Sequence, residues 1–256
     1  MGIVRSPEHD FWMKADLVVA GAFFMWNKRS SFWLQDYLKM TDFLTRRTTM
    51  VDTQIRPADV TKFPIIDAML QVRREMFVPD ELREMAYADA ILSLGHARNI
   101  LEPRTFAKML DAVDIQGNEL ILDIGSGLGY SAAVIGKFAE AVVALEENET
   151  MSLESETILA TEGCLNVAVV QGKLAEGAAQ HAPFDVIMIE GAVDEIPESL
   201  IAQLAEDGRI AAIFSQKGQG VVRVGYKTLG RISWRFACNA YAPTLAGFET
   251  AQEFAL

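Results

Sequence analysis

Apolar residues in this chain form short runs whose spacing changes repeatedly between residues 119 and 214. Continuous apolar runs, typical of buried parallel strands, alternate with stretches in which apolar residues recur at helical spacing. This alternation predicts an α/β fold with a doubly wound parallel sheet. The predicted strands are residues 119–124, 141–145, 168–171, 185–189 and 210–214, and the predicted helices are residues 131–138, 152–162 and 198–204.

The segments on either side of this core follow different patterns. Residues 57–90 alternate helical signals with breakers, and Pro64 stands where a first helical turn would begin. A further helix is predicted over residues 105–113, where apolar residues share one face. Near the C-terminus, residues 221–226 and 232–236 alternate like strands, so we expect the sheet to finish with an antiparallel hairpin.

The stretch from Leu120 to Tyr130 carries the strongest functional signal. A branched apolar run ends in an acid and is followed by alternate glycines, which predicts a buried strand that leads through a tight turn into a helix. Gly125, Gly127 and Gly129 let the backbone approach a ligand closely, because no Cβ stands in the way. The turn also precedes a helix N-terminus, which suits a polar ligand.

A second signal is Glu146, an acid that ends the next predicted strand about 20 residues after the glycines. A carboxylate there accepts hydrogen bonds from ribose hydroxyls, so we expect a nucleoside-containing cofactor. The third glycine comes one residue earlier than in dinucleotide sites. This spacing, with Asp123 two residues upstream, resembles the first motif of the Rossmann-like S-adenosyl-L-methionine (SAM) methyltransferases. The resemblance implies that Asp123 attracts the cofactor's ammonium group, directly or through water.

Composition narrows the classes of partner. The 256 residues are half hydrophobic, which is enough for one domain with elaborations. A net charge of −12 makes nucleic acid a poor partner. The two cysteines and three histidines show no spacing typical of a disulfide framework or a metal site, so no metal is expected. The cytoplasm is the default location, and the oligomeric state stays open.

Residues 1–39 differ from the rest of the chain. Three of the four tryptophans lie there, and the apolar stretch from Leu17 to Trp26 is shorter than the about 20 residues that span a bilayer. No small-residue cleavage site follows, so neither a signal peptide nor a membrane span is expected. We interpret the segment as an extension from an upstream start codon, with Met40 or Met50 beginning the functional chain; an interfacial or partner-binding helix is the alternative.

An ordered set of motifs recurs along the chain from about residue 50 to residue 215. The motifs are Met50–Ile55, Ile66–Met69, Val72–Pro79, Ala86–Asp89, Leu94–His96, the glycine turn with Tyr130–Val134, Pro183–Asp185, Pro197–Leu200 and Gly208–Arg209. In this order they resemble one family, the protein-L-isoaspartate O-methyltransferases. The set is much more specific than any one motif, and the similarity thins toward the C-terminus.

The resemblance implies a SAM-dependent enzyme that methylates the free carboxylate of isoaspartyl residues and so starts the repair of damaged proteins. The partner is an isoaspartyl protein or peptide, or a small carboxylate, with nucleic acid and membrane not expected. Three parts are implied: the extension (1–39), a helical region with the acceptor loop (40–118), and the SAM-binding core with the C-terminal strands (119–256). The residues assigned to the cofactor are Asp123, Gly125, Ser126, Gly127, Gly129, Glu146, Glu147, Lys173 and Leu174.

Three positions depart from the family's pattern. In the loop from Gly95 to Pro103, which the resemblance places at the methyl acceptor, Leu101 replaces the family's serine. Lys173 replaces an aspartate that helps to recognise the adenine amino group, and an ammonium cannot accept a hydrogen bond. Gln171 or a backbone carbonyl is the predicted substitute. Glu190 stands where the family has small or hydroxyl residues.

These departures define the candidate catalytic residues, which are Arg98, Asn99, Leu101 and Glu190. A carboxylate acceptor, with a reference pKa of about 4, needs no general base. Losing the serine removes an anchoring hydrogen bond worth about 1–3 kcal/mol, which the Arg98 guanidinium is predicted to replace unless it is a solvated loop charge. Glu190 is a base for a hydroxyl or amine acceptor, or a salt-bridged strand-end acid. The alternative functions are methylation of another small acceptor and a SAM-binding scaffold without catalysis.

Overall fold

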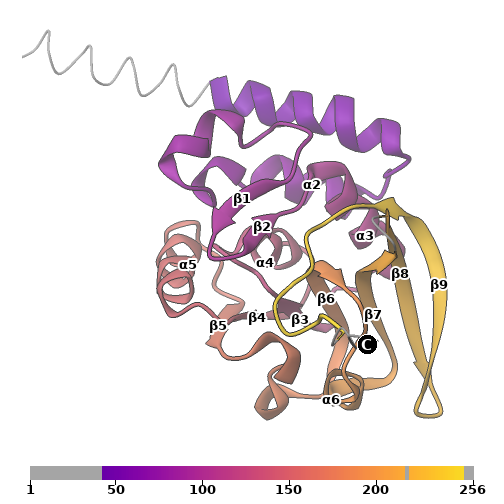
Figure 1. Cartoon of the computed structure of the whole chain (residues 1–256). Coiled ribbons are helices and arrows are strands. Elements are labelled where there is room, and N and C mark those ends of the chain that lie inside the picture. Colours follow the sequence, from indigo (N-terminus) through magenta and orange to yellow (C-terminus); the bar gives the residue numbers. More distant parts are fainter. Residues whose placement is uncertain (1–41, 217–218, 251–256) are drawn as a thin grey trace, which may run out of the picture. The chain divides into compact units, whose positions relative to one another are not determined.

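A seven-stranded mixed sheet forms the centre of the fold (Figure 1). The computed structural model of the chain describes residues 42–216 and 219–250. The strand order is β5-β4-β3-β6-β7-β8-β9, in which β5 to β7 run parallel and β8 and β9 are antiparallel to their neighbours. The strands are β3 (Leu120–Ile124), β4 (Ala141–Glu146), β5 (Val167–Gln171), β6 (Phe184–Val193), β7 (Leu204–Gln216), β8 (Gln219–Thr228) and β9 (Arg231–Ala240).

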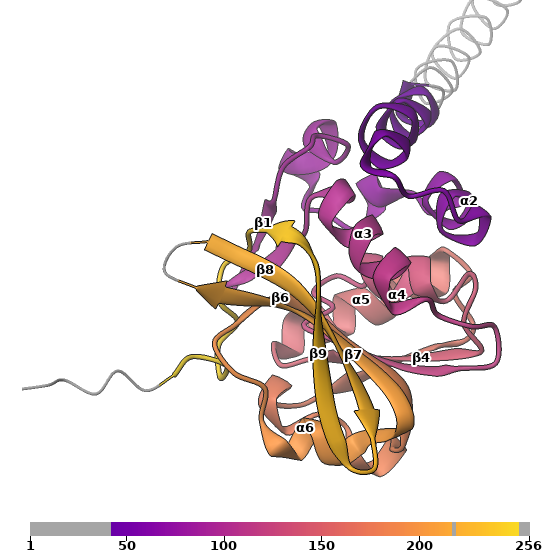
Figure 2. The ribbon, with the colours of Figure 1, turned by 90° about the vertical axis from the view of Figure 1, so that its right-hand side faces the viewer.

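Helices cover both faces of this sheet, with α3, α4 and α5 on one side and α6 on the other (Figure 2). The right-handed crossovers from β3 to β4 and from β4 to β5 explain why α4 and α5 share a face. The helices are α2 (Phe63–Gln71), α3 (Pro103–Val113), α4 (Tyr130–Ile135), α5 (Glu149–Thr161) and α6 (Glu198–Gln203). Shorter helical turns are Val51–Ile55, Arg56–Ala58, Arg74–Met76, Asp80–Met85, Leu174–Glu176 and Ala179–His181.

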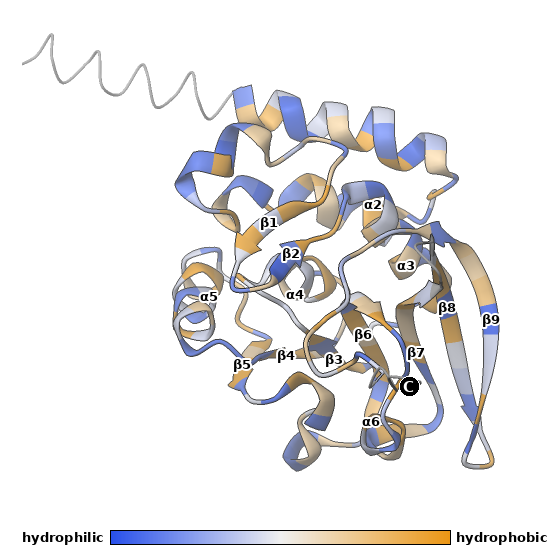
Figure 3. Ribbon diagram, in the orientation of Figure 1, coloured by the Kyte–Doolittle hydropathy of each residue, from blue (hydrophilic) through white to orange (hydrophobic). Residues whose placement is uncertain are grey.

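The predicted fold class is confirmed, because the alternating apolar runs form the parallel strands and the last two strands form the antiparallel hairpin. Apolar residues colour much of β6 and β7 (Figure 3), and every residue of β6 except Asp185 is buried. Burial on both faces of the sheet is what makes such strands continuous apolar runs and not alternating ones.

The sequence analysis did not predict the hairpin of β1 (Leu92–Gly95) and β2 (Arg98–Ile100). The loop expected from Gly95 to Pro103 is therefore wrong in its middle, where Arg98–Ile100 form a strand. Three consecutive residues at its tip, Gly95, His96 and Ala97, have positive φ angles of 85°, 49° and 56°. His96 and Ala97 give no composition signal for this left-handed conformation, which glycine and asparagine favour, so the tight turn was not visible in the sequence.

The contacts within the chain divide it into residues 1–46 and residues 47–256. In the first part the described residues 42–46 are helical, and Arg46 pairs with Asp42 at 2.7 Å. The predicted extension, residues 1–39, lies outside the described residues. Among the helices that are described, none has the length and apolar character needed to cross a membrane.

Candidate active site

Three neighbouring parallel strands each carry a buried acid near their carboxyl ends. Asp123 lies on β3, Glu146 ends β4 and Glu190 lies on β6, and each is at most 6% exposed. The chain leaves β3 toward β4 on one side, while β6 flanks β3 on the other. Such a switch point in strand order is where open α/β sheets bind ligands. The three acids that the sequence singled out thus meet at one edge of the sheet.

The glycine turn after β3 is required by both backbone conformation and packing. Gly125, Gly127 and Gly129 have φ angles of 76°, 57° and 94°, in the left-handed region that side chains disfavour. A Cβ on Gly127 would lie 2.8 Å from Leu94 Cδ1, and one on Gly129 would lie 2.7 Å from Ser155 Oγ. The turn therefore brings the backbone closer to its surroundings than any other residue type permits.

Glu146, the predicted ribose-binding acid, forms a buried ion pair with Arg98. The Arg98 Nε group donates to both carboxylate oxygens, at 3.0 and 3.1 Å, and Arg98 is only 3% exposed. Backbone N–H groups of Gly127 and Asn148 donate to the same carboxylate at 3.0 and 2.9 Å. Glu147, also assigned to the cofactor, is more exposed, and its Oε2 lies 3.6 Å from Arg98 Nη2.

Arg98 therefore lies where the ribose acid was predicted and not in the acceptor pocket with Asn99 and Leu101. The reason is the unpredicted strand β2, because successive side chains of a strand point to opposite sides. Arg98 points to Glu146, whereas its neighbour Asn99 lines the pocket.

Asp123 is fully buried and only half satisfied. The Ser131 hydroxyl donates to its Oδ2 at 2.6 Å, while no residue in the described part of the chain donates to its Oδ1. Burial raises the pKa of Asp123 to about 7, the nearby Glu146 adds to this rise, and the hydrogen bond from Ser131 opposes it. An unsatisfied buried carboxylate oxygen beside a glycine turn is suited to a cationic group of a ligand.

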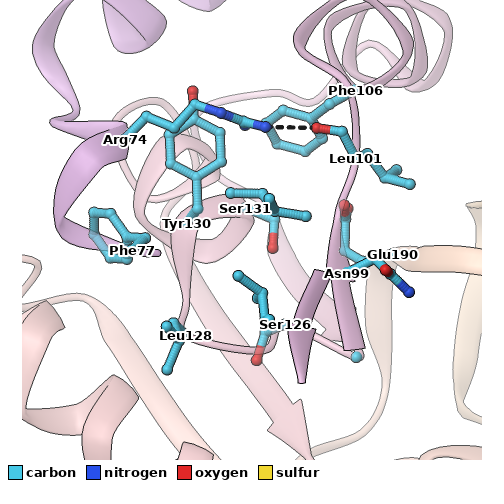
Figure 4. A pocket seen from close by; sticks show the side chains of 13 residues that line it. Arg74, Phe77, Asn99, Leu101, Phe106, Ser126, Leu128, Tyr130, Ser131 and Glu190 are labelled. Carbon is cyan, nitrogen blue, oxygen red and sulfur yellow. Dashed lines mark hydrogen bonds between the residues drawn. The ribbon is translucent and has the colours of Figure 1, made fainter. Parts of the chain in front are cut away.

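A pocket opens between the glycine turn, the β1–β2 hairpin and β6 (Figure 4). Phe77 and Phe106 pack against the Tyr130 ring from two sides, with centroids 5.9 Å away in both pairs. The lining residues are Arg74, Phe77, Leu94, Asn99, Ile100, Leu101, Phe106, Gly125, Ser126, Leu128, Tyr130, Ser131 and Glu190. The predicted residues Asn99, Leu101, Ser126 and Glu190 thus share one pocket.

Several buried polar atoms of this pocket make no hydrogen bond among residues 42–216 and 219–250. They are Arg74 Nη1, Ser126 Oγ, Tyr130 Oη and Glu190 Oε1. A concave apolar site with a few converging unsatisfied polar groups is typical of a small-molecule or active site.

Arg74 is a pocket residue that the sequence reasoning missed. It is fully buried, its Nε donates to the Ala86 carbonyl at 2.6 Å, and its Nη2 donates to the Leu101 carbonyl at 2.7 Å. Its guanidinium carbon lies 4.6 Å from the centre of the Tyr130 ring (Figure 4), and burial lowers its pKa. The only signal was an arginine within the motif Val72–Pro79, next to a second arginine, Arg73, which pairs instead with Glu162.

The two residues assigned after β5 behave differently from each other. Leu174 is 1% exposed and packs toward the glycine turn, where its Cδ1 would lie 3.6 Å from a Cβ on Gly125. The Lys173 side chain is 71% exposed and pairs with Glu176 at 2.9 Å. Its assignment to the cofactor stays a prediction. In the described residues no three His, Cys, Asp or Glu side chains form a metal-binding group.

Comparison with known proteins places this geometry in a family. The family model described as protein-L-isoaspartate(D-aspartate) O-methyltransferase (PCMT) matches residues 45–238. Protein-L-isoaspartate O-methyltransferase 1 of Rhodopseudomonas palustris (strain HaA2) is 36% identical over 186 residues, which cover 72% of this chain and 76% of that protein. Protein-L-isoaspartate O-methyltransferase of Koribacter versatilis (strain Ellin345) is 34% identical over 193 residues, which cover 75% of this chain and 87% of that protein.

Solved structures support the same fold. A protein-L-isoaspartate O-methyltransferase superposes with a TM-score of 0.70 at 24% identity, covering 78% of this chain and 66% of that one. A putative enzyme of this kind from Plasmodium falciparum, solved with S-adenosyl-L-homocysteine, has a TM-score of 0.67 at 19% identity and covers 79% and 97% of the two chains. With the family match over residues 45–238, the chain belongs to the protein-L-isoaspartate(D-aspartate) O-methyltransferase family of SAM-dependent methyltransferases.

Proposed function

We propose that the protein methylates the side-chain carboxylate of isoaspartyl residues in proteins or peptides. The observation that carries this proposal is the buried Arg74 guanidinium, which lines the pocket beside Leu101 and whose Nη1 has no hydrogen-bond partner in the described chain. A buried guanidinium with a free N–H group is complementary to an anionic carboxylate, and its hydrogen bonds to charged acceptors are the strong ones.

The residues at the strand ends fit SAM as the cofactor. The unsatisfied Asp123 Oδ1 is an acceptor for an ammonium group, and Glu146 is a buried carboxylate suited to ribose hydroxyls. The turn between them has glycine at 125, 127 and 129, where no Cβ covers the backbone. When bound, the cofactor supplies a methyl group on a positively charged sulfur. The protein's task is then to hold the acceptor in line with that methyl group and to exclude water.

A carboxylate acceptor requires no residue that removes a proton, because it is already ionised at neutral pH. The pocket is suited to this task, since Phe77, Phe106 and Leu101 give it apolar walls around the Arg74 guanidinium. In such surroundings the pairing of an acceptor carboxylate with Arg74 is stronger than in water.

The test is transfer of labelled methyl groups from SAM to a peptide that contains isoaspartate. The control peptide has the same sequence with normal aspartate, and a metabolite extract is assayed in parallel. We expect alkali-labile methyl ester on the isoaspartyl peptide alone. Labelling of the extract without labelling of the peptide would favour another small acceptor, and SAM binding without labelling of either would favour the scaffold without catalysis.

A further inference from the structure

Glu190 reaches the acceptor pocket because β6 is irregular at this point. The pairing of β6 with β7 shifts between Met188 and Ala192, so the residues around Glu190 bulge out of register. Bulges of this kind redirect a side chain next to active sites. The bulge is held in place by Leu245, since a Cβ on Gly191 would lie 2.5 Å from Leu245 Cγ. It is also held by the Leu245 N–H group, which donates to the Ala192 carbonyl at 2.9 Å.

The redirected side chain faces the segment that lost the family's serine. Strand β2 contacts β6, and Glu190 lines the same pocket as Asn99 and Leu101 (Figure 4). The Leu101 side chain brings no hydroxyl to this wall. Glu190 is 6% exposed, and its Oε1 has no hydrogen-bond partner among the described residues.

The charges around Glu190 favour its neutral form. The ionisable groups that act on it are Asp123 on β3 and Arg74 in the helical turn Arg74–Met76. Burial raises the pKa of Glu190 well above its ordinary value, Asp123 raises it further, and only Arg74 lowers it. A buried carboxyl beside a second acid keeps its proton, and a protonated carboxyl is a hydrogen-bond donor.

We propose that Glu190 donates a hydrogen bond from its carboxyl O–H group to one oxygen of the acceptor carboxylate, and that it thereby replaces the missing serine hydroxyl. Arg74 Nη1 binds the acceptor together with it. This inference rests on the proposed function and identifies the residue that selects an anionic acceptor in this chain.

The reaction balances without any proton transfer. An acceptor oxygen uses a lone pair to form a bond to the methyl carbon, the sulfur–carbon bond breaks, and its electron pair stays on sulfur. The acceptor changes from a carboxylate to a neutral ester, and Glu190 keeps its proton. Its hydrogen bond holds the second oxygen, so it restricts rotation of the carboxylate while the first oxygen attacks.

The proposal makes the pH dependence specific. When Glu190 ionises, the donor is lost and a negative charge faces the acceptor, so kcat/KM for a carboxylate acceptor should fall as pH rises through the pKa of Glu190. Glu190→Gln keeps a donor but cannot ionise, so its profile should lack this fall. If Glu190 were instead a base toward a hydroxyl acceptor, kcat/KM would rise with pH and Glu190→Gln would be inactive.

The experiment compares wild type with Glu190→Gln and Glu190→Ala on the isoaspartyl peptide from neutral to alkaline pH. At neutral pH, kcat/KM should fall about 10- to 100-fold in Glu190→Ala, and Glu190→Gln should recover most of that loss. Glu195→Gln, which removes an exposed acid five residues away, is the control for the change in net charge. The proposal would be overturned if Glu190→Gln were as inactive as Glu190→Ala. It would also be overturned if kcat/KM of Glu190→Gln and of wild type depended on pH in the same way.

A binding measurement separates this inference from the proposed function. Propionate is titrated into the S-adenosyl-L-homocysteine complex of wild type and of Glu190→Gln at two pH values. These lie below and above the pH at which kcat/KM of wild type falls. If no peptide is methylated, neutral and strongly alkaline pH are used instead. Wild type should release propionate at the higher pH while Glu190→Gln retains it. That result would support the role of Glu190 even if the isoaspartyl peptide were not methylated and the proposed function failed. No propionate binding in wild type, or equal pH dependence in both proteins, would overturn it.

Discussion

Replacing Arg98 by glutamine should make the folded protein less stable but increase its affinity for the cofactor. The Glu146 carboxylate already accepts N–H groups from Arg98, Gly127 and Asn148, with Arg98 bridging both oxygens. A carboxylate has about four acceptor positions, so ribose hydroxyls can bind only where Arg98 withdraws. The ion pair thus stabilises the ligand-free protein and competes with the cofactor at the same atoms.

The magnitude follows from this competition. A hydrogen bond to a charged group contributes about 1.5–3 kcal/mol, and about 1.4 kcal/mol corresponds to a tenfold change in affinity. Arg98→Gln should therefore tighten binding by about 10- to 100-fold. Removing one partner of a buried ion pair costs about 3–5 kcal/mol, and the lower end is expected because two backbone donors to Glu146 remain.

The assay is calorimetric titration with S-adenosyl-L-homocysteine, which cannot react, together with urea unfolding. Arg209→Gln is the matched control, because Arg209 forms a similar two-bond pair with Glu119, at 2.9 and 2.7 Å, just before β3 and so at the opposite end of that strand. It should lower the free energy of unfolding without changing the affinity. Unchanged or weaker binding by Arg98→Gln would refute the competition.

A double-mutant cycle then tests where the displaced guanidinium goes. Glu147 is a nearby, partially exposed acid, with Oε2 3.6 Å from Arg98 Nη2. If Arg98 moves to Glu147 when the cofactor binds, Glu147→Gln should weaken binding in wild type but not in the Arg98→Gln background. Equal losses in both backgrounds would mean that Glu147 contacts the cofactor directly.

Three further predictions concern other parts of the chain. Leu101→Ser should raise kcat/KM on the isoaspartyl peptide and partly rescue Glu190→Ala, while lost burial lowers the stability measured by urea unfolding; an inert serine variant with normal SAM binding would argue against isoaspartyl repair. The free energy of unfolding should fall as pH rises from about 4 to about 7, because folded Asp123 keeps its proton to about pH 7 and the unfolded chain releases it near 3.8. Asp123→Asn should make that fall smaller, leaving the part that the buried Glu190 contributes, and should weaken SAM binding; urea unfolding across pH and calorimetry check the two effects. A chain that begins at Met40 should bind SAM with unchanged affinity, since the family match begins at residue 45; loss of binding or solubility would show that residues 1–39 cover part of the core.

The sheet, the glycine turn and the acids near the ends of β3, β4 and β6 could all be predicted from the amino-acid sequence. These features are local. A few neighbouring residues are enough to recognise an apolar run, a set of alternate glycines or an acid that follows a strand. Parallel strands then necessarily align their carboxyl ends at one edge. For this reason the amino-acid sequence alone is enough to identify Asp123, Glu146 and Glu190 as candidate site residues.

The partners of the buried charged side chains, by contrast, follow from the folded structure and could not be predicted. Arg98 lies 48 residues from Glu146, and it turns away from the acceptor pocket because β2 is a strand that the sequence did not reveal. Arg74 reaches the Leu101 carbonyl across 27 residues. Glu190 enters the pocket through a bulge that the C-terminal segment holds in place. A buried charge is placed by whichever distant partner satisfies it, because leaving it unpaired costs several kcal/mol, and the spacing of residues along the chain does not encode that partner.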